Sequence, residues 1–152
     1  MPRKQLNSVG GIVYYIADDG QPKYLIIKRH ARSKKIERVA PKGKVEDGES
    51  PEQTCIREIG EETSIQAQYL SVGEKLWAVQ IKNINFWQWF NEKEVIYYLV
   101  QYSGKPDDVN IQLVEWFLGI HKRASIQEIT WLILYPSMRN IFLLWHKHIT
   151  TT

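Results

Sequence analysis

Residues 41–65 read PKGKVEDGESPEQTCIREIGEETSI, and this acid-rich stretch decides how the rest of the chain is interpreted. Its middle contains clear helix signals. Ser50 suits the N-cap, Pro51 suits the first turn, and Gln53 completes a Ser-x-x-Gln capping box. The pattern predicts a helix over residues 51–63. That helix would pack on a sheet through an apolar stripe of Cys55, Ile56 and Ile59.

The other side of the predicted helix is acidic. Glu58, Glu61 and Glu62 stand at i, i+3 and i+4, so their carboxylates project close together and repel. Arg57 is able to pair with Glu61 one turn on, but one arginine does not neutralise three acids. A hard divalent cation does, and carboxylate oxygens favour Mg²⁺, with Mn²⁺ as the alternative. The competing interpretation is a solvated acidic helix face.

The spacing beyond the helix favours the metal site. Eight positions match the pattern G-x5-E-x7-R-E-U-x-E-E-x-G-U, in which U is aliphatic: Gly43, Glu49, Arg57, Glu58, Ile59, Glu61, Glu62 and Ile65. From average residue usage, a chance match has odds on the order of one in a million. Residues 43–65 therefore resemble the Nudix box. Ser64 departs from it, because the family has glycine there as a left-handed C-cap. Serine at this position is expected either to cost up to about 1 kcal/mol or to shift the helix end.

The resemblance implies a role for each matching position. The metal ligands would be Glu58, Glu61, Glu62 and the backbone carbonyl near Lys42 and Gly43. Arg57 would orient the acids, and Glu49 would brace the loop against the helix. A general base must take a proton from the attacking water. Glu58 and Glu62 are candidates for it, and Glu115, outside the box, is a further candidate as base or extra ligand.

Segments outside the box are similar to the diadenosine tetraphosphate hydrolase branch of the Nudix family. They include SVGGIVYY at 8–15, APKGKVEDGES at 40–50 and the Lys93-x-Val95-Ile96-Tyr97-x-Leu99 pattern, as well as segments 126–128 and 135–148. Ala40 and the Lys122-Arg123 pair depart from this branch, which has proline and tryptophan there. From their chemistry, Lys93 is a candidate to hold a distal phosphate, and Tyr97 is a candidate to stack on a purine.

A basic cluster precedes the box and consists of Lys28, Arg29, Arg32, Lys34, Lys35 and Arg38. It is interpreted either as a solvated loop or as a site for substrate phosphates. The residues predicted to bind substrate are Lys42, Lys93, Tyr97 and Arg29.

The remaining elements predict an α+β fold. Apolar runs at 8–16 and 23–29 flank Asp18-Asp19-Gly20 and favour a hairpin. Further strands are expected at 68–81, 94–102 and 112–120, with residues 82–92 as a connecting loop. Two helices should close the chain, one after Ser125 and the other from Pro136. The resemblance implies the Nudix-type α/β/α sandwich, with a mixed β-sheet between helices.

Composition sets further limits. The 152 residues are 43% apolar and 24% charged, which fits one Nudix domain over residues 1–152. Cys55 is the only cysteine, so no disulfide forms within the chain. Neither a signal-peptide pattern nor a membrane-length apolar run is present, so we expect a cytoplasmic protein without membrane contact. The sequence leaves a monomer and a homodimer both open.

Together these features predict Mg²⁺-dependent hydrolysis of a phosphoanhydride bond in a nucleoside polyphosphate, with a dinucleoside polyphosphate such as diadenosine tetraphosphate as the leading substrate. Alternatives within this chemistry are nucleoside triphosphates, nucleotide sugars, and capped or triphosphorylated RNA 5′ ends, the one form in which nucleic acid would be a partner. A non-catalytic Nudix module that senses nucleotides is a different class of function, but the box retains every acid. A nucleic-acid-binding domain is a third interpretation, based on the pI of about 8.9 and the basic cluster.

Overall fold

The structure is a computed structural model that describes residues 6–30, 35–82, 92–106, 109, 117–133 and 136–151. Its elements are β1 (Leu6–Ile16), β2 (Pro22–His30), β3 (Ile36–Val39), β4 (Lys42–Lys44), α1 (Pro51–Thr63), the short 3-10 helix η1 (Ala67–Tyr69), β5 (Leu70–Lys82), β6 (Glu92–Tyr102), β7 (Phe117–Ala124), α2 (Ile126–Leu132) and α3 (Pro136–Thr151). No helix among the described residues is long and apolar enough to span a membrane.

A mixed sheet of seven strands forms the centre of the fold. Its order is β3-β2-β1-β6-β5, with β4 paired to β1 and β7 paired to β2. β1 runs parallel to β6 and antiparallel to β2 and β4. The β1–β2 connection is the predicted hairpin, in which Gly20 takes a φ of 82°. On either side of Gly10 in β1 lie Lys42 of β4 and Tyr97 of β6.

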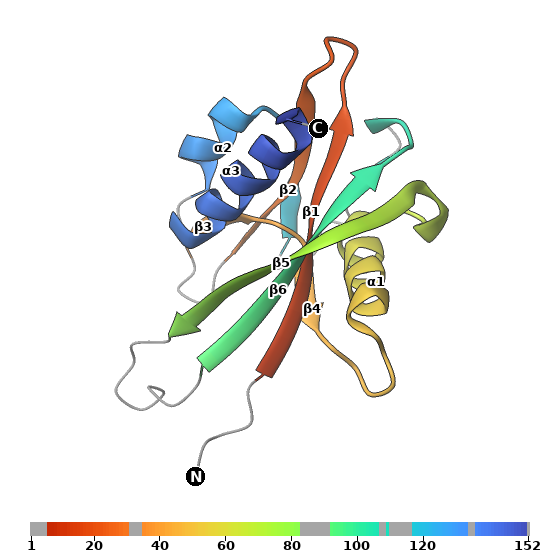
Figure 1. Cartoon of the computed structure of the whole chain (residues 1–152), viewed down its shortest axis with the longest axis vertical. Helices are drawn as coiled ribbons and strands as arrows, with labels where there is room; N and C mark the ends of the chain where they lie inside the picture. Colours follow the sequence, from red (N-terminus) through yellow and green to blue (C-terminus); the bar gives the residue numbers. More distant parts are fainter. Residues whose placement is uncertain are drawn as a thin grey trace.

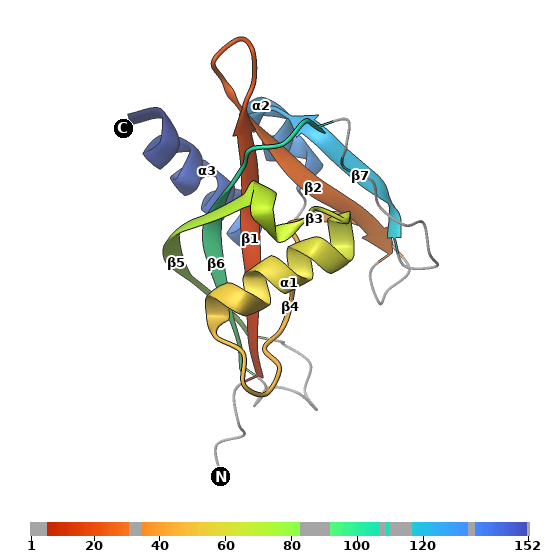
Figure 2. The same cartoon turned by 90° about the vertical axis from the view of Figure 1, so that its right-hand side faces the viewer.

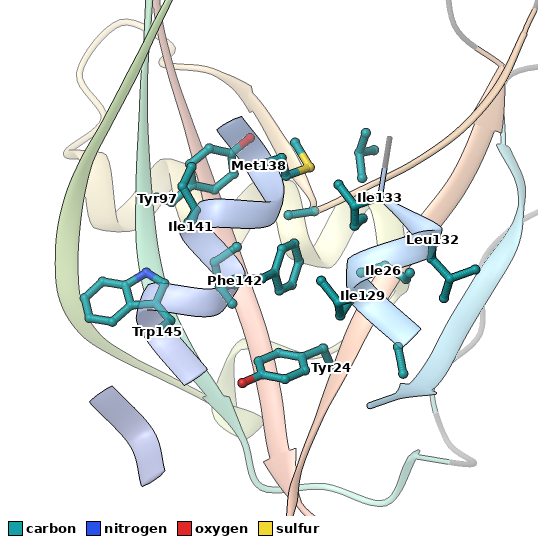
Figure 3. Close-up of a cluster of buried hydrophobic side chains, with 14 of the residues drawn as sticks. Tyr24, Ile26, Tyr97, Ile129, Leu132, Ile133, Met138, Ile141, Phe142 and Trp145 are labelled. Carbon is teal, nitrogen blue, oxygen red and sulfur yellow. The ribbon is translucent and has the colours of Figure 1, made fainter. Parts of the chain in front are cut away.

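Helices cover both faces of this sheet. α1 lies on one face, whereas α2 and α3 lie together on the other (Figures 1 and 2). On the first face, Cys55 and Ile59 of α1 join a buried cluster with residues of the sheet. On the second face, Phe142 of α3 packs edge-on against Tyr24 in a larger apolar cluster (Figure 3). The predicted α/β/α sandwich is confirmed.

The helix signals act as expected. α1 spans the predicted residues, and the Ser50 hydroxyl accepts a hydrogen bond from the Gln53 backbone while Gln53 reaches back to the Ser50 backbone. Ser125 forms the same capping box at the start of α2. Ser64 has a φ of 63°, the left-handed conformation that glycine takes more easily. Both predicted caps are therefore confirmed, and so is the left-handed helix end.

The basic cluster was only partly a loop. Lys28 and Arg29 belong to β2, as the predicted hairpin strand over residues 23–29 indicated. Arg38 belongs to β3, which pairs antiparallel with β2, so the loop interpretation was wrong for Arg38. Both β3 and β4 are short and rich in charge, which hides them from a pattern based on apolar runs. Arg32 and Lys34 lie outside the described residues.

The later predicted strands correspond to β5, β6 and β7, with shifted ends. β5 begins at Leu70 because residues 67–69 form η1, and β7 begins at Phe117 and continues to Ala124. Residues 83–91, most of the predicted connecting loop, and residues 110–116 lie outside the described part of the chain.

Candidate active site

Arg57 is the centre of a network that ties α1 to the preceding loop. Its guanidinium donates Nε to Glu49 Oε2 at 2.7 Å and Nη2 to Glu49 Oε1 at 2.9 Å, a paired contact with one carboxylate. Nη2 also donates to the Lys44 carbonyl at 2.9 Å. Nη1 donates to Glu58 Oε1 at 2.8 Å and reaches both oxygens of Glu61 at 3.3 Å. Arg57 therefore contacts two of the three predicted metal-binding acids.

Glu49 fixes the loop on which the network depends. Besides Arg57, it accepts hydrogen bonds from the Glu46 backbone and the Thr54 hydroxyl, both at 3.0 Å. The bonds from Arg57 are the main reason that the pKa of Glu49 falls to about 2, and the Glu46 backbone bond adds to them. The carboxylate is therefore ionised at neutral pH, and Glu49 braces the loop against the helix as the resemblance implied.

Glu62 is a buried carboxylate with little compensation. Only 8% of the residue is exposed, and its Oε2 accepts a hydrogen bond from the Lys42 backbone at 3.1 Å. Burial is the main cause that raises its pKa to about 8, and the nearby charge of Glu58 adds to the effect. Burial also raises the pKa of Glu58, although Arg57 opposes the shift. For both acids, the positive charge nearby does not fully offset the effect of burial.

A glycine lets Glu58 lie against β4, the strand beside α1 (Figure 2). A Cβ added at Gly43 would overlap the carboxylate of Glu58, so any larger residue would displace one of them. At Gly10 of β1, a Cβ would lie 2.6 Å from the Pro41 carbonyl oxygen and 2.9 Å from Cε1 of Tyr97. Both glycines therefore hold the 41–43 segment close to the acids.

The acids fit a divalent cation by their chemistry. Glu58 and Glu62 provide hard oxygen donors beside the Gly43 backbone, and Glu61 adds a mostly exposed side chain that is able to turn toward them. The raised pKa of Glu62 shows a site where added positive charge would be favourable. In the part of the chain that the structure describes, no three Asp, Glu, His or Cys side chains are already grouped as a metal site. The three-glutamate ligand set stays a prediction.

The predicted substrate-binding residues have different positions relative to the acids. Arg29 is half-buried, and its charge influences Glu62, so it lies close to the acids. Tyr97 is only 2% exposed and belongs to the cluster under α3, so its ring has no open face for the predicted stacking on a purine (Figure 3). The side chain of Lys93 and the whole of Glu115 lie outside the described residues.

Sequence patterns missed two contributors to the site. Glu37 is buried and pairs with Arg29 across β2 and β3. Predicting this pair would have required β3 to be recognised first. Tyr98 donates its hydroxyl to Glu52 at 3.2 Å and fixes the first turn of α1 to β6. Because side chains alternate along a strand, Tyr97 and Tyr98 face opposite ways, and they belong to clusters on opposite faces of the sheet.

With this geometry established, the family follows. The NUDIX domain profile matches residues 7–134, so the chain belongs to the NUDIX family, which generally uses divalent metals. The chain is 41% identical over 92 residues to the asymmetrical bis(5′-nucleosyl)-tetraphosphatase of Sus scrofa, covering 58% of this chain and 59% of that protein. It is 36% identical over 77 residues to the 8-oxo-dGTP diphosphatase of Escherichia coli (strain K12), covering 50% of this chain and 54% of that protein. It thus spans little more than half the length of these curated relatives.

Solved structures support the fold. A C. elegans Ap4A hydrolase in a binary complex superimposes with a TM-score of 0.75 at 21% identity, covering 97% of this chain and 99% of that one. The M. smegmatis Nudix hydrolase RenU has a TM-score of 0.76 at 14% identity, covering 97% and 87%. At such identities the likeness concerns the fold alone.

Proposed function

We propose that this protein is a divalent-metal-dependent Nudix pyrophosphohydrolase, with Mg²⁺ as the metal, and that it hydrolyses a dinucleoside polyphosphate such as diadenosine tetraphosphate. The observation that carries the proposal is the acid cluster, defined as Glu58, Glu61 and Glu62. Two of its carboxylates are partly or fully buried against β4, and Arg57 joins two of them to the Glu49 loop. Buried like charges of this kind are unfavourable unless a cation joins them.

The acid cluster and the Gly43 carbonyl would hold the metal ion. When bound, such an ion neutralises polyphosphate charge and makes a coordinated water more acidic. Arg57 keeps Glu58 and Glu61 on one side of α1, where its hydrogen bonds limit their rotation. Lys42 and Arg29 add positive charge beside Glu62.

Proton transfer is assigned to the buried acids. A general base must lie close enough to the attacking water to take its proton. Glu58 and Glu62 lie beside the 42–43 segment, where the metal ion would be held, whereas the side chain of Glu61 is mostly exposed. Of the acid cluster, we therefore propose Glu58 and Glu62 as the groups that take the proton from water.

The substrate class rests on the similarity to the Sus scrofa tetraphosphatase, which has the higher identity and longer match of the two curated relatives. The site chemistry is compatible with it, because the cations Lys42 and Arg29 flank the acids and suit a long anionic chain. Because the Tyr97 ring is buried, we assign the base of the nucleotide to a surface other than that ring.

The test is hydrolysis of diadenosine tetraphosphate by the purified protein in H₂¹⁸O, with Mg²⁺, with Mn²⁺ and with a chelator. We expect turnover only with metal, and ¹⁸O in one product, which identifies the phosphorus that water attacks. Glu61→Gln and Glu62→Gln should each lower kcat by about 100-fold or more, since they remove charge needed at the metal. Glu52→Gln is the matched control, because it lies on the same helix and its amide oxygen still accepts from Tyr98.

A second candidate substrate class is the nucleoside triphosphates, favoured by the 36% identity to the 8-oxo-dGTP diphosphatase. A parallel panel with 8-oxo-dGTP, the common triphosphates and nucleotide sugars separates the two classes by kcat/KM. A higher value for a triphosphate would overturn the dinucleoside substrate but leave the hydrolase. Absence of turnover on the whole panel, with nucleotide binding retained, would instead identify a sensing module.

A further inference from the structure

Arg29 and Glu37 form a cross-strand ion pair next to the acid cluster. They are register partners in β2 and β3, and Arg29 Nε donates to Glu37 Oε1 at 2.8 Å. Glu37 is 7% exposed and is one of two buried acids among the described residues, the other being Glu62. The Arg29 side chain is 26% exposed, so the arginine side of the pair faces outward. A charge buried to this degree requires a partner, and Arg29 provides it.

The charge of Arg29 acts on the acid cluster through Glu62. Burial is the main cause of the raised pKa values of Glu62 and Tyr97, and the charge of Arg29 opposes the shift in both. Its guanidinium is therefore close to both groups. Nε is committed to Glu37, whereas Nη1 and Nη2 donate to no acceptor within the described part of the chain. Two parallel donors therefore remain for a ligand near a site proposed to receive polyphosphate.

We propose that Glu37 is a positioning residue for substrate: it holds Arg29 by Nε so that both terminal nitrogens bind oxygens of the polyphosphate chain. This inference rests on the proposed function and names one of its phosphate contacts. A guanidinium presents two N–H groups in the spacing of phosphate oxygens, and fixing its orientation beforehand reduces the entropy lost on binding. Glu37 acts through Arg29 and contacts no substrate itself.

A purely structural role would explain the same hydrogen bond, because a cross-strand pair also stabilises the β2–β3 edge. The two roles differ in what the pair affects. A structural pair changes the unfolding temperature, whereas a positioning pair changes KM and the affinity for phosphates in molecules that remain folded. Removing Glu37 also leaves Arg29 with more net positive charge, so simple electrostatics predicts tighter phosphate binding, the opposite of what positioning predicts.

The experiment measures KM and kcat for diadenosine tetraphosphate, and the inhibition constants of inorganic triphosphate and of adenosine. Arg29→Ala should raise KM and the triphosphate constant about 10-fold, the loss expected for one charge-assisted contact. Glu37→Ala should raise both about 3- to 10-fold, and Glu37→Gln, which still accepts from Nε, should recover much of the loss. The adenosine constant should change by less than about 2-fold in each variant, and kcat by less than about 2-fold in the two Glu37 variants.

The double variant Arg29→Ala/Glu37→Ala gives the sharpest result. If Glu37 acts through Arg29, the double variant binds triphosphate no more weakly than Arg29→Ala alone. Unfolding temperatures are measured in parallel, and Arg123→Ala, an exposed arginine on β7, is the control for loss of surface charge.

Three results would overturn the inference. They are unchanged or tighter triphosphate binding in Glu37→Ala, fully additive effects in the double variant, or effects of similar size in Arg123→Ala. These results differ from failure of the proposed function, which would appear as absence of hydrolysis by the unmodified protein. Even then, the binding of inorganic triphosphate to the unmodified protein and its variants would still test the pair.

Discussion

The helices on the two faces of the sheet begin with the same capping box, but the residues buried beneath them differ. Ser50 and Ser125 both form capping boxes, one before α1 and the other before α2. Under α2 and α3 the buried cluster is apolar throughout, apart from tyrosine and tryptophan polar groups. Under α1 the buried set includes the acid Glu62. Because burying an acid is unfavourable, the difference indicates that the α2–α3 face serves packing and the edge of α1 serves chemistry.

The largest expected effect comes from truncating one core residue on each face. Phe142 and Ile59 are both completely buried. Phe142→Ala should cost about 3–5 kcal/mol and Ile59→Ala about 2–5 kcal/mol of unfolding free energy, from lost contacts and the cavity left behind. Only Ile59→Ala should also lower kcat per folded molecule, because Ile59 lies beside Glu58 in α1. Urea unfolding and activity at saturating substrate, both measured below the unfolding transition, test this pair. An equal loss of kcat in Phe142→Ala would contradict the division between faces.

A smaller effect concerns the charge of Glu62 in the metal-free protein. Its pKa is about 8 in the folded protein against an ordinary value of 4.5, so the protonated form favours folding. This stabilisation is present below about pH 4.5 and is lost as the pH rises toward 8. With chelator present, the unmodified protein should lose several degrees more in Tm than Glu62→Gln between pH 5 and 8.5.

Mg²⁺ should remove most of that difference at pH 8.5, because it binds the folded state of the unmodified protein. The Glu62→Gln variant should gain less from the metal. Parallel pH curves for the two proteins would mean that Glu62 is ionised at no cost to the fold.

Arg57 joins the helix to the loop, so replacing it should lower activity more than it lowers stability. Arg57→Lys keeps the charge but removes the paired contact with Glu49 and the donor to the Lys44 carbonyl. We expect kcat to fall about 10-fold, because the acid cluster loses its fixed orientation, while unfolding free energy falls by about 1 kcal/mol. A kinetic comparison with Arg139→Lys on α3, whose arginine contacts one backbone carbonyl of α2, provides the control. A similar kcat loss in both variants would rule out a special role for the Arg57 network.

The same contrast explains how far the sequence predicted the molecule. The α1 bounds, both capping boxes and the β1–β2 hairpin depend on residues close in the chain, and these were predicted correctly. The pairing of Arg29 with Glu37 depends on β3, which is too short and charged to be recognised alone. Tyr97 was assigned to stacking from its chemistry, but its position between Gly10 and the cluster under α3 is a property of the assembled sheet. Nonlocal burial was therefore the missing information.

The smallest expected effect is at the end of α1. Ser64 holds a φ of 63°, and its backbone N–H bonds to the Gly60 carbonyl at 2.9 Å. Glycine adopts this conformation without the steric penalty of a Cβ, so Ser64→Gly should raise unfolding free energy by up to about 1 kcal/mol. The part that glycine gains in unfolded-chain entropy reduces this benefit.

Activity should not change in Ser64→Gly, because the residue lies after the last acid of the cluster and its side chain contributes no ligand. Ser64→Ala is the matched control: it removes the hydroxyl but keeps the Cβ, and should not be more stable than the natural protein. Measuring the unfolding temperature and kcat/KM of each variant distinguishes the outcomes. If glycine raised stability but lowered kcat/KM, the strained helix end would be part of how α1 presents Glu61 and Glu62. The C-terminal end of α1 would then contribute to catalysis as well as to packing.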